Sequence, residues 1–146
     1  PGDVQRMSAG TGVRHSEFNA SQSELVHFLQ IWILPNQKGT APGYEQKHFA
    51  PTELAGRLRV IASPDGRDGS VTIQQDAYLY ATKLTHGAQA VHALAPGRSA
   101  YVHVARGAVN VNGKSLSAGD GARIEAEANV TLGHAKDAEV LVFDLP

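Results

Sequence analysis

The chain has 146 residues, which fits one domain or one domain with part of a second. Apolar residues make up 42% of it, enough for a core, and the formal net charge is −1 with Lys and Arg scattered along the sequence, which argues against nucleic-acid contact and against a polybasic membrane anchor. The lack of cysteine excludes disulfides and thiolate metal sites, and no apolar run approaches the ~20 residues of a membrane helix.

Short β-prone runs separated by Gly, Pro, Asn and Asp dominate the sequence and predict an all-β sandwich or barrel. The expected strands are 4–8, 14–18, 26–34, 44–49, 58–62, 70–73, 77–84, 90–94, 100–105, 108–112, 122–125, 129–132 and 139–144. One helical turn is expected over 52–57, after Pro51. Asn112-Gly113 predicts a tight hairpin, because both central residues of such a turn adopt positive φ.

A weak internal repeat indicates two similar β-modules. Each copy begins with a Gly-Asp turn and ends in an apolar strand closed by Leu-Pro, at Leu34-Pro35 and at Leu145-Pro146. A full set of strands precedes the second copy, whereas nothing precedes the first. We therefore expect residues 1–36 to be the end of a truncated first domain and residues 37–146 to be a complete second domain. A start at Pro1 rather than Met fits a trimmed piece of something longer.

His15 and Glu17 are the candidate metal ligands of the sequence. Residues two apart on an extended strand face the same side, so an imidazole and a carboxylate would point together. Such a pair suits divalent iron, manganese, nickel or zinc. Gly10 and Gly12 would allow a tight turn just before the pair. From spacing alone, a solvated surface pair is the more common reading.

The segment Gly10–Asn19 resembles the second cupin motif, P-x-G-x-x-H-x-x-x-N, at Gly12, His15 and Asn19, with Gly10 in the usual proline position. The form G-T-G-V-R-H-S-E is similar to the pirin branch of that family. The similarity continues through L-Q-I-W-I (29–33), Y-E-Q (44–46), S-P-D-G-R-D-G-S (63–70), Q-D (75–76), V-N-G (111–113) and V-L-V-F-D-L-P (140–146).

The resemblance implies a bicupin, of which this chain would carry the C-terminal cupin, a jelly-roll sandwich without metal, and the last strands of the metal-binding N-terminal cupin. In pirins, the motif's His and the Glu two residues later bind the metal, which here designates His15 and Glu17. The family completes a three-His, one-Glu site with an H-x-H pair, and no H-x-H occurs in this sequence.

Two functions follow from the resemblance. The first is a dioxygenase that uses Fe(II) or another divalent metal to cleave a flavonol such as quercetin, with Glu17 as both metal ligand and catalytic base. The second is a non-enzymatic regulatory or binding protein, a partner of transcription factors or metabolic enzymes, in which the metal is structural or senses redox state. The 146 residues alone are expected to be inactive, and to associate as a homodimer or with a missing N-terminal half through unpaired strand edges.

The remaining aromatic and histidine residues have plainer readings. Trp32, Phe28, Tyr78 and Tyr80 are expected to pack in the core. His27 and His92 are expected to be structural histidines in strands. With no secretory signal in view, a cytoplasmic protein is the default expectation.

Overall fold

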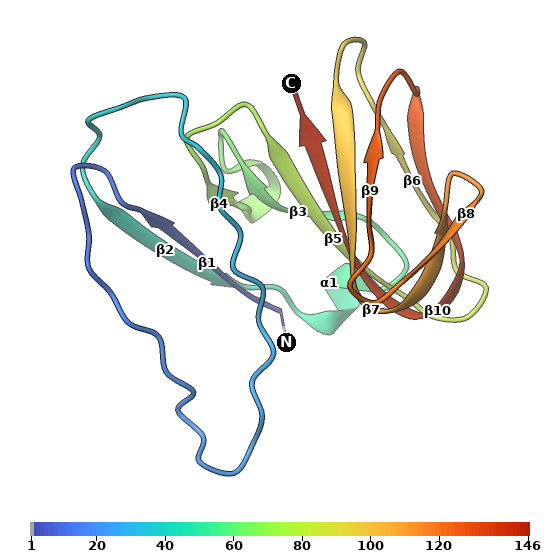
Figure 1. Ribbon diagram of the computed structural model, residues 1–146, viewed down its shortest axis with the longest axis horizontal. Coiled ribbons are helices and arrows are strands. Elements are labelled where there is room, and N and C mark those ends of the chain that lie inside the picture. The colour runs from blue at the N-terminus through green and yellow to red at the C-terminus, as the bar shows by residue number, and fades with distance from the viewer. Residues whose placement is uncertain (1) are drawn as a thin grey trace.

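A computed structural model describes residues 2–146 as a nearly all-β molecule (Figure 1). The strands are β1 Asp3–Ser8, β2 Gly43–His48, β3 Arg59–Ser63, β4 Val71–Thr72, β5 Tyr78–Leu84, β6 Ala90–Ala93, β7 Ser99–Val111, β8 Lys114–Ser117, β9 Gly121–Ile124 and β10 Asn129–Leu145. Helix α1 spans Pro51–Leu54, and a 3₁₀ turn spans Arg67–Gly69. The expected all-β class is confirmed. No helix in the described part of the chain is long and apolar enough to cross a membrane.

Two long strands, β7 and β10, organise the main sheet. The strand order is β4-β3-β5-β10-β7-β8, with β6 also paired to β10 and β9 to β7. The sequence predicted two shorter strands in place of each long one, separated near Arg106-Gly107 and near Gly133–Asp137. Those interruptions are irregularities of register within β10 and its pairing with β7. Bulges of this kind bend a strand without ending it, so one strand can serve both layers of a sandwich.

The main core lies between the two layers that β7 and β10 connect. Its fully buried side chains include Val102, Val130, Leu132 and Val142. A second apolar cluster joins Phe49 and Leu54 to Ile61, Val71 and Leu79. The alternation of buried and half-exposed residues along β7 and β10 is the pattern of strands with one face turned inward.

The predicted turn elements are present. Asn112 (φ 47°) and Gly113 (φ 85°) join β7 to β8 as the hairpin requires. The helical turn is present as α1, in which the Glu53 carboxylate accepts a hydrogen bond of 2.8 Å from the Ala50 backbone N–H. This contact is the main reason that the pKa of Glu53 is lowered.

The strands predicted at 14–18 and 26–34 are wrong, because both segments lie in irregular coil. An extended run forms a strand only when a neighbour satisfies its backbone groups, and neither run is paired with any described strand. The same cause overturns two core assignments, since Trp32 is 87% exposed and Phe28 60% exposed. Tyr78 and Tyr80 are half-buried in β5. His27 also lies in coil rather than in a strand, whereas His92 lies in β6 as expected.

Strands β1 and β2 form a separate two-stranded sheet beside β4 (Figure 1). Polar contacts tie β2 to the main domain: the Thr72 N–H donates to the Glu45 carboxylate at 2.9 Å, and Lys47 donates to the Ser70 carbonyl at 2.7 Å. The β1–β2 pairing thus runs across the predicted boundary at residues 36 and 37. That division into domains stays a prediction.

Candidate functional site

The turn that precedes the candidate ligands is built on two glycines. Gly10 (φ 56°) and Gly12 (φ 131°) both have positive φ, and the Gly12 N–H donates to the Ala9 carbonyl at 2.8 Å. A Cβ at Gly10 would come within 2.3 Å of the Thr40 carbonyl oxygen, so only glycine allows this close approach. The predicted tight turn is therefore present, directly after β1.

His15 and Glu17 lie in the exposed coil that follows this turn. The strand geometry that would place these two side chains on one face is not formed, because residues 14–18 pair with no strand among residues 2–146. Their assignment as ligands stays a prediction. Downstream, Asn19 of the motif organises a loop: its side-chain amide donates to the Glu24 carbonyl at 2.6 Å and its carbonyl accepts from the Ser21 N–H at 3.1 Å.

The chemistry of the two side chains fits half of a metal site. An imidazole nitrogen and a carboxylate oxygen are both ordinary ligands of divalent first-row metals. Within residues 2–146, no three His, Asp or Glu side chains converge as a metal-binding group. A catalytic metal needs about three protein ligands, so His15 and Glu17 supply two donors and require others.

A polar network in the second domain was not predicted from the sequence. The buried carboxylate of Asp144, near the end of β10, is paired with Arg98 and lies 2.7 Å from His92 Nε2. Arg98 also reaches the Asp76 carboxylate at 3.0 and 3.1 Å. Burial alone would lower the pKa of Arg98, but its bonds and charge interaction with Asp144 and Asp76 outweigh that effect and raise it. The ring of Tyr80 lies 4.5 Å from that of His92, and burial, followed by the charge of Asp144, raises the pKa of Tyr80.

Two residues of this network lie in segments that resemble pirins, but their separation in the sequence gives no sign that they meet in the fold. Asp76 and Asp144 lie in Q-D and F-D-L-P, two of the segments that resemble pirins, but 68 positions separate them. Only the fold brings them to the same arginine. The prediction of His92 as a structural histidine agrees with its bond to Asp144.

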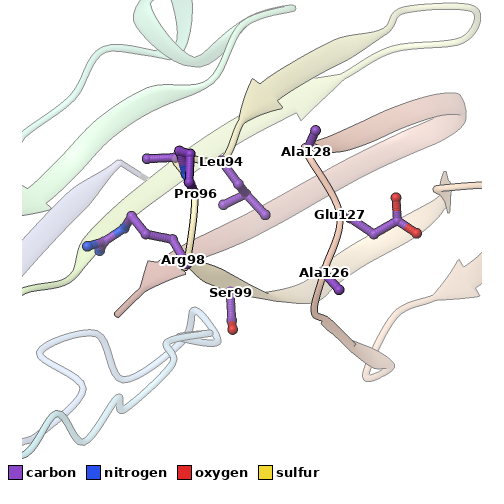
Figure 2. Close-up of a pocket in the computed structure, with 9 residues that line it drawn as sticks. Leu94, Pro96, Arg98, Ser99, Ala126, Glu127 and Ala128 are labelled. Atoms are coloured by element: carbon purple, nitrogen blue, oxygen red, sulfur yellow. The ribbon is translucent and has the colours of Figure 1, made fainter.

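Open pockets lie at two places on the surface formed by residues 31–146. The first is lined by residues 94–99 and 126–128, and Figure 2 shows Arg98 and Glu127 pointing in opposite directions, away from each other. Its charged groups therefore do not converge on a ligand. The second is apolar, and lies between residues 31–34 and the side chains of Tyr101, Phe143 and Leu145.

Comparison with known families and proteins agrees with these features. Residues 60–145 match the family described as the quercetinase C-terminal cupin domain, and residues 1–33 match the family described as pirin. The chain is 43% identical over 145 residues to a quercetin 2,3-dioxygenase of Escherichia coli, covering 99% of this chain and 62% of the relative. It is 40% identical to a pirin-like protein of Caulobacter vibrioides, of which it also covers 62%. The chain thus spans under two thirds of the length of these relatives.

Solved structures give the same grouping. The structure of YhhW from Escherichia coli superposes with a TM-score of 0.91 at 43% identity, over 99% of this chain and 61% of that one. The structure of the bacterial pirin YhhW from the same organism in complex with nickel(II) gives a TM-score of 0.90 at 44% identity, over 99% of this chain and 62% of that one. The turn at Gly10 and Gly12, the β-sandwich and the similarity to these families and relatives agree. This chain belongs to the pirin family of cupin proteins.

Proposed function

We propose that this chain is part of a metal-dependent dioxygenase that acts on a flavonol such as quercetin. The observation that carries the proposal is its 43% identity, over 99% of its length, to a protein named quercetin 2,3-dioxygenase. Two other relatives, of Pseudomonas aeruginosa and Pasteurella multocida, are named putative quercetin 2,3-dioxygenase, which favours an enzyme over the non-enzymatic alternative.

His15 and Glu17 are the residues of this chain that would hold the metal. A divalent metal, when bound, supplies a Lewis-acid centre at which flavonol and dioxygen meet. Nickel(II) in the related pirin structure supports a divalent metal, and we propose iron(II) as the resident ion. The remaining ligands would come from outside these 146 residues.

Glu17 has a second task in this proposal. A flavonol that binds through a deprotonated 3-hydroxyl oxygen has lost the hydroxyl proton, so a base must accept that proton. The Glu17 carboxylate would accept that proton as a general base, provided that it lies within hydrogen-bonding reach of the hydroxyl. His15 would keep its ring nitrogen for the metal and would not take part in the proton transfer.

Many apolar side chains upstream of the second domain are exposed, which suggests that another polypeptide covers them. They are Met7, Val13, Phe18, Leu25, Val26, Phe28, Leu29, Ile31, Trp32 and Leu34. A patch of this kind marks an interaction surface. We propose that the missing portion of the first cupin covers it in the intact protein, and that the 146 residues alone pair with a second copy instead.

A chimera tests these proposals together. The part of the Escherichia coli relative that this chain does not match, which we expect to precede the matched region, is joined to residue 1. We expect quercetin-dependent oxygen uptake by the iron-loaded chimera, which should be monomeric in light scattering. The 146-residue chain should show no uptake and should self-associate.

Controls in the chimera separate the roles. His15→Ala should abolish uptake, whereas His86→Ala, at an exposed loop histidine, should leave it unchanged. An iron-loaded, folded chimera without uptake would favour the regulatory alternative. Turnover by the 146-residue chain itself would contradict the proposal that further ligands lie outside it.

A further inference from the structure

The segment from Ile31 to Thr40, here called the strap, is held on the second domain by one short loop. The Gln75 side chain donates to the Leu34 carbonyl at 2.8 Å, and the Asn36 N–H donates to the Gln74 carbonyl at 2.8 Å. The Thr40 hydroxyl donates to the Gln74 side-chain carbonyl at 3.1 Å. All three bonds are made with residues 74 and 75, so the position of the strap depends on the position of this loop.

The loop is in turn held by Arg98. The Asp76 N–H donates to the Gln75 side-chain oxygen at 2.8 Å, which orients that side chain toward the strap. Arg98 binds both carboxylate oxygens of Asp76 and, at 3.3 Å, its backbone carbonyl. A guanidinium that grips one residue at three points fixes the backbone as well as the side chain.

Arg98 is itself anchored in the core by Asp144. It pairs with the Asp144 carboxylate and donates to the Asp144 carbonyl at 3.1 Å, while His92 occupies the second carboxylate oxygen. The side chains of Arg98 and Asp144 are only 16% and 8% exposed. Water therefore competes weakly for the hydrogen bonds between Arg98 and Asp144. It competes more strongly for those between Arg98 and Asp76, whose side chain is 56% exposed.

We propose that Asp144, Arg98, Asp76 and Gln75 form a latch that fixes the strap on the second domain. The latch extends from a buried carboxylate to a backbone carbonyl of the strap, and every link in it is a hydrogen bond or an ion pair. The far end of the strap lies against Gly10, within the turn that leads to His15. The latch thus joins the core of the second domain to the segment that carries the motif around His15.

Amide hydrogen exchange of the Asn36 N–H in the 146-residue chain tests the latch. Gln75→Ala removes the bond to Leu34, and Asp76→Asn weakens the outer end while leaving the buried pair in place. Each should speed exchange at Asn36 about fivefold, the factor that one net hydrogen bond supplies. Trypsin cleavage after the exposed Lys38 should also be faster in both variants than in the parent.

Two further variants separate a latch from general loss of stability. Gln89→Ala changes an exposed glutamine outside the latch and should leave both rates at the parent values. Arg98→Lys keeps a positive charge but loses the planar fork, and should speed exchange at Asn36 although Arg98 does not touch the strap. Unfolding midpoints in urea should stay unchanged for Asp76→Asn. Parent-like exchange at Asn36 in both Gln75→Ala and Asp76→Asn would overturn the proposal.

Discussion

Glu45, in β2, is one of the residues that tie the small β1–β2 sheet to β4 of the main sheet. Its carboxylate accepts from the Thr72 N–H at 2.9 Å and also contacts Arg6 at 3.3 Å and Lys47 at 3.0 Å. The Thr72 bond is the largest of the causes that lower the pKa of Glu45, followed by the bond from Lys47. The charged form is therefore the one that the folded state prefers.

The sign of the resulting pH dependence follows from that direction. A folded-state pKa below the unfolded value of about 4.3 means that Glu45 stabilises the protein fully above that pH. The contribution is lost as the pH falls through the folded-state value. Glu45→Gln should therefore be destabilised relative to the parent at pH 6, with the difference shrinking toward pH 3.

Urea unfolding at a series of pH values measures this difference. Glu127→Gln provides the matched control, because Glu127 is an exposed glutamate of the second domain, and its curve should run parallel to that of the parent. A Glu45→Gln difference that stays constant from pH 6 to pH 3 would show that the carboxylate charge has no part in holding β2.

At the scale of elements, the β7–β8 hairpin rests on Asn112 in two ways. Its φ of 47° suits asparagine better than most residues. Its side chain donates to the Asn129 carbonyl at 2.9 Å and accepts from the Thr131 N–H at 2.7 Å. The sequence predicted the first role, from Asn-Gly, but could not predict the second, because it depends on where β10 begins.

Two substitutions distinguish these roles. Asn112→Gly tolerates the backbone and loses only the two side-chain bonds, so we expect a loss of about 2 kcal/mol in the free energy of unfolding. Asn112→Ala adds the cost of a left-handed alanine, about 1 kcal/mol more. Chemical denaturation measures both values. If Asn112→Gly were as stable as the parent, the side-chain bonds to β10 would contribute nothing.

The local sequence pattern correctly predicted most strands that pair with another strand of this chain. Most strands after residue 43, the helical turn after Pro51 and the hairpin at Asn112-Gly113 form close to where the sequence placed them, although β7 and β10 were each predicted as two strands and β8 was not predicted. The runs 14–18 and 26–34 have the same β-prone composition yet remain coil. Their sequence could not reveal this, because strand formation depends on a neighbour as much as on propensity.

At the scale of the whole molecule, the candidate site and the second domain differ in how much the sequence could predict. The motif around His15 and Glu17 was recognisable from a few residues, and so was the family. The Asp144 network was not, because Asp76, His92, Arg98 and Asp144 are brought together only by the fold. A family motif can designate candidate ligands that are neighbours in sequence, but it misses groups that converge from separate strands.

The metal content of the chimera is the most direct test of the central claim, that His15 and Glu17 are two ligands of one divalent metal. The protein is loaded anaerobically with iron(II), desalted, and analysed for iron per chain. We expect about one iron in the parent and in Glu24→Gln, an exposed neighbour that joins its loop through its backbone. Glu17→Gln and His15→Ala should fall well below one while remaining folded. Full iron occupancy in both of these variants would contradict the account.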